Sequence, residues 1–154
     1  MIRAWRIVKA RHAGDAFLGE GARLAGGRWN NRGTAVVYAS DSLALAALEL
    51  FIHLGKARFA LSFVSFRIEI PDDVRVESIP VEELPANWRD EPPPDATKDL
   101  GTRWAKAGTS VVLRVPSVLV PEEFNFLLNP SHPEFRDIRI GSPEPFTFDP
   151  RMQK

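Results

Sequence analysis

The chain has 154 residues, with 20 Lys and Arg against 20 Asp and Glu, three His and no Cys. This length corresponds to a single domain, 1–154, and the zero formal charge excludes a generally basic protein drawn to nucleic acid or membrane. The absence of Cys excludes disulfides, Cys-ligated zinc and a thiol nucleophile, and no apolar run approaches the roughly 20 residues of a membrane helix, so we expect a soluble, cytoplasmic protein.

The sequence of the N-terminal part predicts two short strands with a glycine-rich segment between them, followed by a helix. Residues 2–9 alternate weakly, as a first strand does. Residues 13–34 lack periodicity and predict a long loop of a kind that is usually functional or mobile. A strand is predicted over 35–39, and a helix follows that Ser40 or Asp41 caps and that ends at about Leu54, before Gly55.

The clearest strand is predicted over residues 59–70, where the apolar positions change phase at Val64, as a β-bulge would cause. The acidic, proline-rich residues 71–97 predict a surface connection outside the site. The remaining predicted elements are a helix over 95–106 ended by Gly108, a strand over 110–115 that stops at Pro116, a helix end at Asn125, a turn at Asn129, and short strands over 135–140 and 145–148. Strands outnumber helices, which indicates a mixed α/β or α+β fold.

Charge is divided along the chain although it sums to zero. Residues 1–60 carry a net charge of +5 and residues 61–154 a net charge of −5, and all thirteen prolines lie at or after Pro71. Such a split either marks a face for an anionic ligand or is an uneven distribution of solvated charge. The motifs of the basic segment favour the first interpretation.

Glu49 is the first candidate functional residue. Only Ser42, Glu49 and His53 are polar in the run 42–54, and a helix that is apolar nearly all round packs on several sides. A carboxylate there is either a structural group paired with His53 or an Arg, or a functional group that lines a cavity. We favour the functional role because an unneeded charge at this position would cost stability.

The segment GGRWNNRG, 26–33, is the second candidate. Glycines let the backbone approach a ligand closely, and the planar fork of Arg28 suits a phosphate or carboxylate. A surface turn with a packed Trp29 is the alternative. Tyr38, the single tyrosine, ends a predicted strand and is either a ligand-stacking residue or a core tyrosine.

Ser117 also ends a predicted strand. It lies in no G-x-S-x-G elbow and has no local His partner, so we expect a positioning hydroxyl or a turn residue rather than a nucleophile. The three His lack metal-ligand spacing, and no metal site is expected. An Arg, a Tyr, a Glu and a Ser without thiol or metal suit a phosphate-bearing ligand and a cationic transition state, which favours glycosyl or ADP-ribosyl transfer over acyl transfer.

Six ordered blocks resemble the RES-domain toxins, the toxin halves of bacterial type II toxin–antitoxin pairs. The blocks are GGRWN (26–30), VVYAS (36–40), LAALEL (45–50), GTRWAKAG (101–108), LRVPS (113–117) and NFLLNPSHPEF (125–135). The Arg, Glu and Ser that name the family fall on Arg28, Glu49 and Ser117. The stretch 71–97 is the part of the chain that these blocks do not match.

The resemblance implies an α+β domain similar to the ADP-ribosyltransferase fold and a toxin that depletes NAD+ by cleaving its nicotinamide–ribose bond, with water or phosphate as acceptor. Arg28 would bind the diphosphate or orient the ribose, Tyr38 would position nicotinamide, Glu49 would stabilise the ribosyl cation, and Ser117 would hydrogen-bond in the pocket. Trp29 and Asn129 are lesser NAD+-binding candidates. NAD+ is the substrate, and no separate cofactor is implied.

The family also implies a partner and an alternative activity. The partner is an Xre-like helical antitoxin that inserts its C-terminal part into the pocket, and the toxin would form a homodimer within that complex. Some members modify a protein by ADP-ribosylation. From another class, the basic first 60 residues with Trp5, Phe17 and Trp29 suggest a non-catalytic nucleic-acid-binding module, and a degenerate member acting only as a protein partner is a third hypothesis.

Overall fold

The computed structural model describes residues 1–153, apart from the side chains of residues 57 and 58. Its strands are β1 (Ile2–Lys9), β2 (Val37–Ser40), β3 (Phe63–Ile70), β4 (Val76–Ser78), β5 (Val112–Pro116), β6 (Phe124–Leu128), β7 (Arg139–Ile140) and β8 (Glu144–Phe146). Within the described residues they form one eight-stranded sheet in the order β4-β5-β6-β2-β1-β3-β7, with β8 also paired to β3. β4 and β5 pair in parallel, and the other neighbours pair antiparallel.

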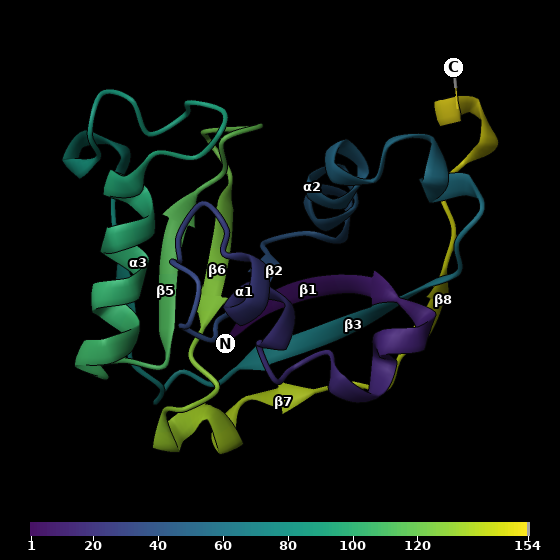
Figure 1. The fold of residues 1–154 in the computed structure, drawn as a ribbon. Helices are drawn as coiled ribbons and strands as arrows, with labels where there is room; N and C mark the ends of the chain where they lie inside the picture. Colours follow the sequence, from purple (N-terminus) through teal and green to yellow (C-terminus); the bar gives the residue numbers. More distant parts are fainter. Residues whose placement is uncertain (154) are drawn as a thin grey trace.

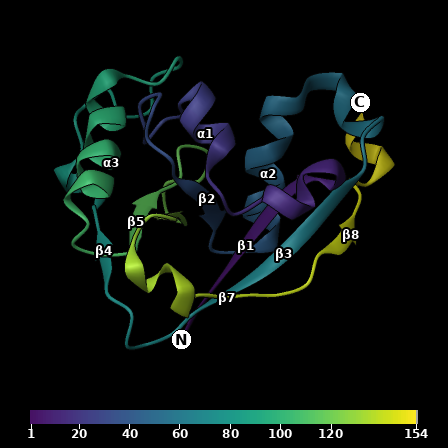
Figure 2. The same cartoon turned by 60° about the horizontal axis from the view of Figure 1, so that its bottom comes forward.

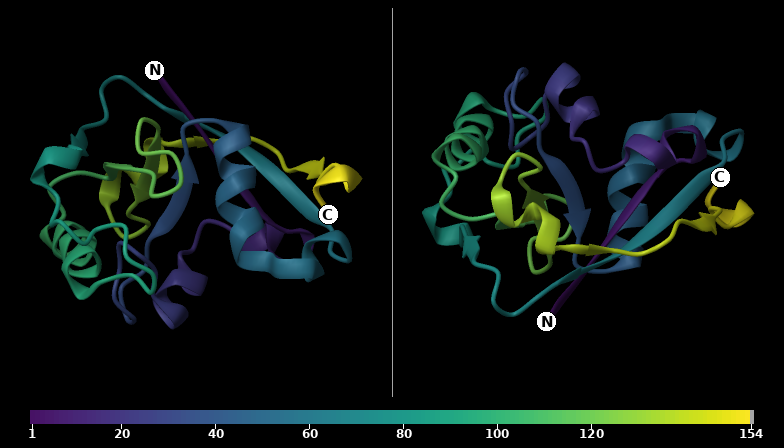
Figure 3. Two further views of the ribbon diagram at one scale, coloured as in Figure 1. Left: turned by 90° about the horizontal axis from the view of Figure 1, so that it is seen from above. Right: turned by 90° about the horizontal axis from the view of Figure 1, so that it is seen from below.

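The sheet is strongly bent, and the helices cover its two arms. β5 and β6 run across the direction of β1 and β3 in the view of Figure 1, and β2 joins the two arms. Helix α3 (Asp95–Ala107) lies along the β5–β6 arm, α2 (Leu43–Leu54) lies beside the β1–β3 arm, and the short α1 (Glu20–Ala25) sits between them (Figures 2 and 3). A mixed sheet with few helices confirms the predicted α+β class.

Three apolar clusters hold these layers together. The central cluster combines side chains from β1, β2, β3, β5 and β6 and includes Phe126 and Ile68. A second cluster, which we call the tryptophan core, packs Trp29, Trp88 and Trp104 between α3 and the β5–β6 arm. The third cluster lies under α2 and is rich in Phe rings that meet edge to face around Phe148. Both arms of the sheet are therefore fixed independently of any ligand.

Local signals predicted the two long helices well. α3 ends at Gly108, which has a left-handed φ of 65° and donates its backbone N–H to the carbonyl of Trp104. α2 ends at Gly55, as predicted, but its N-cap is Ser42, whose hydroxyl accepts from the N–H of Leu45. The predicted caps Ser40 and Asp41 are wrong because β2 extends to Ser40.

The predicted bulge in the 59–70 strand is wrong. β3 begins at Phe63 and pairs with β1 without interruption, from Lys9 opposite Phe63 to Ile2 opposite Ile70. The apolar phase changes because the two ends of β3 are covered on opposite faces. Phe63 points to the cluster under α2, whereas Ile68 and Ile70 point to the central cluster.

Three other segments differ from the prediction. Residues 124–128, where a helix end was predicted, form the central strand β6, which is buried on both faces and so lacks the alternation of a half-exposed strand. The loop 13–34 contains α1. The first half of the strand predicted over 135–140 belongs to a 3-10 helix, Pro133–Asp137, and only its last two residues form a strand, β7. The 3-10 helix begins where the ring of His132 accepts from the N–H of Glu134.

Candidate active site

Glu49 lies where α2 faces the start of β6 and the loop after β5. Its Oε1 accepts a hydrogen bond from the Ser117 hydroxyl at 2.7 Å and another from the Asn125 side-chain amide at 2.7 Å. The side chain is half-buried. Among the described residues Glu49 forms no ion pair with His53 or with an Arg. These residues therefore do not support the alternative in which Glu49 is a structural group paired with one of them.

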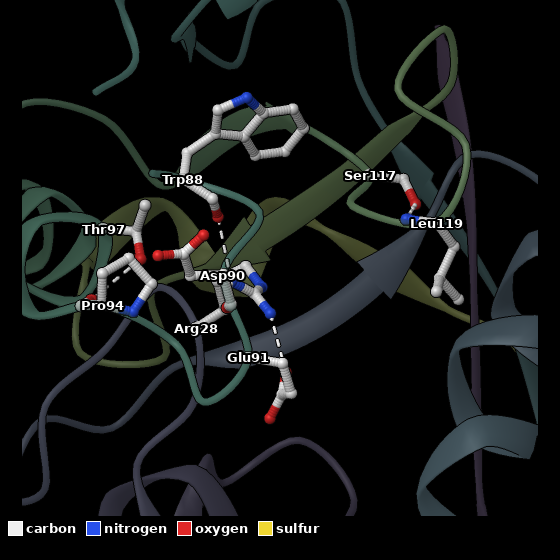
Figure 4. Close-up of polar contacts among 8 residues, drawn as sticks. All are labelled: Arg28, Trp88, Asp90, Glu91, Pro94, Thr97, Ser117 and Leu119. Carbon is white, nitrogen blue, oxygen red and sulfur yellow. Dashed lines mark hydrogen bonds and ion pairs between the residues drawn. The ribbon is translucent and has the colours of Figure 1, made fainter. Parts of the chain in front are cut away.

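Ser117 is fully buried, at 0% exposure. Its Oγ donates to Glu49 and accepts from the backbone N–H groups of Leu119 and Val120 at 3.1 and 3.2 Å (Figure 4 shows the Leu119 contact). A hydroxyl has one hydrogen and two lone pairs, and all three are engaged here. The geometry therefore supports a positioning hydroxyl rather than a nucleophile.

Tyr38 fastens the glycine-rich segment 26–33 to β2. Its hydroxyl donates to Oδ1 of the fully buried Asn30 at 2.6 Å and accepts from the backbone N–H of Trp29 at 3.2 Å. Burial raises the pKa of Tyr38, and this outweighs the opposing effects of the Trp29 hydrogen bond and the nearby Arg28 charge. The phenol is therefore neutral near pH 7 and can donate or accept a hydrogen bond but cannot serve as an anionic base.

Arg28 lies under the acidic, proline-rich segment. Its Nη1 donates to the carbonyls of Trp88 and Asp90 at 2.9 and 2.8 Å, and its Nη2 pairs with the Glu91 carboxylate at 2.9 Å (Figure 4). The prediction that residues 71–97 lie outside the site is wrong, because the 88–91 segment bonds directly to the candidate arginine. The physical reason is Trp88, which is 7% exposed and anchors this segment in the tryptophan core beside Arg28.

Trp29 and Asn129, the two lesser candidates, lie in the interior. Trp29 is part of the tryptophan core and is 3% exposed. The Asn129 amide donates to the carbonyl of Ala105 and accepts from the N–H of Ser131, both at 3.0 Å. Asn129 also stands four residues along the chain from Asn125, or about 13 Å at the rise of a strand. Their contact with NAD+ stays a prediction, and their present contacts are structural.

Sequence reasoning missed two polar residues that the fold places at or near the site. Asn125 contacts Glu49. It was not identified from the sequence because the segment that forms β6 was predicted to be a helix end. Arg6, on β1, donates from Nε to the carbonyl of Ala16 and from Nη1 to the carbonyl of Tyr38, both at 2.8 Å. Burial lowers the pKa of Arg6 to about 10 against the opposing effect of Asp15, so the guanidinium stays charged at neutral pH.

The candidate residues thus form three hydrogen-bonded groups, of which the last two share the 26–33 segment. Glu49 and Ser117 share one hydrogen-bond network, Tyr38 is bonded to the 26–33 segment, and Arg28 holds the 88–91 segment. A surface hollow of about 450 Å³ opens beside Gly26, Asn30 and Arg32, away from the Glu49 network. Within residues 1–153, no cluster of three or more His, Asp or Glu side chains has a geometry that could hold a metal ion, and no helix is long and apolar enough to cross a membrane.

The aromatic residues that suggested a nucleic-acid-binding module do not form a stacking surface. Trp29 is buried, Phe17 packs edge to face on Phe66 with ring centroids 5.1 Å apart, and Trp5 is half-buried, with the guanidinium of Arg67 6.0 Å from its ring. Bases stack on exposed aromatic faces. The geometry of these three residues therefore gives that hypothesis no support.

Arg28 and Glu91 should differ in their effect on stability. We expect Arg28→Lys to lower the free energy of unfolding by about 1–3 kcal/mol, because an ammonium group lacks the planar fork that reaches two carbonyls and a carboxylate together. Glu91→Gln should change it by less than about 0.5 kcal/mol, since an ion pair with a 73%-exposed carboxylate contributes little. Urea unfolding measures both, and an equal loss in the two variants would contradict this assignment.

Comparison with solved structures gives the class of the fold. A chain in the crystal structure of the M. tuberculosis MbcT–MbcA toxin–antitoxin complex matches with a TM-score of 0.74, covering 95% of this chain and 84% of that chain at 17% sequence identity. At that identity the match establishes the α+β fold alone. It is nonetheless a match over nearly the entire chain.

Comparison with known sequences gives the family. Residues 3–149 match the model of the RES domain. The protein named Toxin Res from Yersinia enterocolitica serotype O:8 is 40% identical over 151 residues, covering 97% of this chain and 98% of that protein. The protein named Prs ADP-ribosylating toxin from Sphingobium sp. is 41% identical over 152 residues, covering 96% and 94%. The chain belongs to the RES domain family, which confirms the resemblance drawn from its six sequence blocks.

Proposed function

We propose that this chain is the toxin of a toxin–antitoxin pair and that it cleaves the nicotinamide–ribose bond of NAD+. The observation that carries the proposal is the half-buried Glu49 carboxylate, which two donors fix through one oxygen. Cleavage at an anomeric carbon passes through an oxocarbenium-like state, and a fixed carboxylate stabilises that positive charge. The relative named Toxin Res supports the role of a toxin, and the relative named Prs ADP-ribosylating toxin supports chemistry that transfers ADP-ribose.

In the proposed reaction, water attacks C1′ of the nicotinamide ribose while the C1′–N bond breaks and its electron pair leaves with nicotinamide. The products are nicotinamide, ADP-ribose and one proton, and with phosphate as acceptor the product is a 1′-phosphorylated ADP-ribose. Glu49 lies beside the developing cation and stabilises it. Tyr38, as a neutral phenol, orients the nicotinamide or ribose.

Arg28 is suited to bind the diphosphate of NAD+. A guanidinium has five N–H groups, and the contacts with Trp88, Asp90 and Glu91 engage three of them. The two others can donate to an anion. Glu91 is 73% exposed, so a diphosphate can take its place on Nη2 at little cost.

The test is release of free nicotinamide from NAD+ by the folded, antitoxin-free chain, with and without inorganic phosphate. We expect release in at least one condition, and dependence on phosphate distinguishes phosphorolysis from hydrolysis. A folded chain that releases no nicotinamide in either condition would disprove the proposed activity.

Transfer of ADP-ribose to a protein is the second candidate activity, and the relative named Prs ADP-ribosylating toxin favours it. Both activities break the same bond and need the same carboxylate, and they differ in the acceptor. Incubation of the chain with NAD+ labelled in the adenosine half and a bacterial lysate separates them, because only transfer to protein leaves a label that resists denaturation and gel filtration.

The structural relative MbcT–MbcA is a toxin–antitoxin complex, which supports a partner, and we propose that an Xre-like antitoxin covers the site of this chain. α2 presents Leu48 and Ile52 at 38% and 51% exposure, one residue before and three residues after Glu49. A cover over Glu49 would bury both apolar side chains. Co-expression with the antitoxin should abolish nicotinamide release, and size-exclusion chromatography with light scattering would test the homodimer within that complex.

A further inference from the structure

We infer that Asn125 is a positioning residue for Glu49, an inference that rests on the proposed cleavage of NAD+. Ser117 and Asn125 both donate to the same carboxylate oxygen, Oε1, each at 2.7 Å. Among the described residues, no hydrogen bond or ion pair reaches Oε2. The carboxylate is therefore held by one oxygen, and within the described residues its other oxygen is left without a hydrogen-bond partner.

The orientation of the Asn125 amide follows from its two neighbours. Its Oδ1 accepts from the hydroxyl of Ser40 at 2.7 Å, and its Nδ2 donates to Glu49. An ionised carboxylate can only accept hydrogen bonds, so the nitrogen of the amide must face it. Ser40 is 4% exposed and directly opposes Asn125 across the β2–β6 pair, which means that the register of the sheet fixes the donor chain from Ser40 through Asn125 to Glu49.

Ser117 acts on the same oxygen from another direction. Because its hydroxyl is saturated and fully buried, it has no free hydrogen-bonding atom for a ligand. On this inference Ser117 holds Glu49, and this is the hydrogen bond that it contributes to the pocket. Two donors, Asn125 on β6 and Ser117 in the loop after β5, thus fix the position of this carboxylate oxygen.

This arrangement predicts a loss of turnover rather than of NAD+ binding when Asn125 is changed. A misplacement of about 1 Å at a reacting group costs on the order of 100-fold in rate. Asn125→Asp keeps the shape of the side chain but puts a second acceptor against Oε1, so the Glu49 carboxylate must turn away. Asn125→Ala removes the donor without adding repulsion, and Ser40→Ala removes the group that fixes the amide.

The experiment measures kcat and KM for nicotinamide release by the full chain, together with the thermal midpoint of each variant. We expect kcat to fall on the order of 100-fold in Asn125→Asp, about tenfold in Asn125→Ala and a few-fold in Ser40→Ala, with KM for NAD+ within about twofold of the wild-type value. Gln153→Glu, the same change of an amide to a carboxylate at an exposed position, is the control and should leave both constants unchanged.

The outcomes separate this inference from the proposed function. A wild-type chain that releases no nicotinamide would disprove the proposed function. With an active wild type, a folded Asn125→Asp variant of normal kcat would overturn the inference alone, and so would a raised KM at normal kcat, since that would place Asn125 on the substrate. If Asn125→Asp fails to fold, Asn125→Ala and Ser40→Ala decide the question by the same criteria.

Discussion

Glu49→Gln is expected to lower kcat for nicotinamide release on the order of 1,000-fold, which corresponds to about 4 kcal/mol of lost transition-state stabilisation. Glutamine keeps the length and shape of the side chain, and its oxygen can still accept from Ser117 and Asn125. The variant therefore removes the negative charge beside the ribosyl cation while the network stays in place. The same steady-state assay measures the effect, and expression of the variant in cells should no longer be toxic.

Two further variants make this result specific to the charge of Glu49. Glu144→Gln removes an exposed carboxylate from β8 and should leave kcat unchanged. Glu49→Ala leaves the donors of Ser117 and Asn125 without their acceptor, so it should also lower the free energy of unfolding by about 1–3 kcal/mol, whereas Glu49→Gln should not. A Glu49→Gln variant that keeps wild-type turnover and toxicity would show that Glu49 has no catalytic role.

The sequence predicts those features of the fold that depend on local chemistry. β1 is recognisable from its alternation, α3 from Gly108 at its end, and α2 from Gly55 at its end. Glu49 stood out because a lone carboxylate in an apolar helix is costly, and the structure gives it two hydrogen-bond donors. Each of these inferences rests on a residue and its neighbours within a turn or two of the chain.

The features that the sequence does not predict depend on contacts between distant segments. Asn125 meets Glu49 across 76 residues of chain, and the carbonyl of Trp88 meets Arg28 across 60. The phase change in β3 suggested a bulge because a sequence does not say which face of a strand each end will bury. The central strand β6 was missed for a related reason, since burial on both faces removes its alternation.

Gly101→Ala is expected to have the largest effect on stability. Gly101 is buried in α3, and a Cβ atom built there would lie 1.7 Å from the carbonyl oxygen of Trp29 and 2.8 Å from its carbonyl carbon. Both atoms are backbone, so no side-chain rotation relieves the clash. We expect the free energy of unfolding to fall by more than about 4 kcal/mol, although alanine is favoured over glycine in a helix by about 1 kcal/mol.

The clash also links this packing contact to the site. α3 and the 26–33 segment would have to separate by more than about 1 Å, and a close-packed interior resists such a shift. Trp29 follows Arg28 directly and donates its N–H to Tyr38, so any folded Gly101→Ala protein should also lose nicotinamide release. Thermal unfolding tests this against Gly21→Ala in α1, where a Cβ meets nothing within 4 Å and alanine should stabilise the protein by about 0.5–1 kcal/mol. A Gly101→Ala variant with the wild-type midpoint would mean that α3 does not pack against the Trp29 backbone. The position of the 26–33 segment would then not depend on this contact.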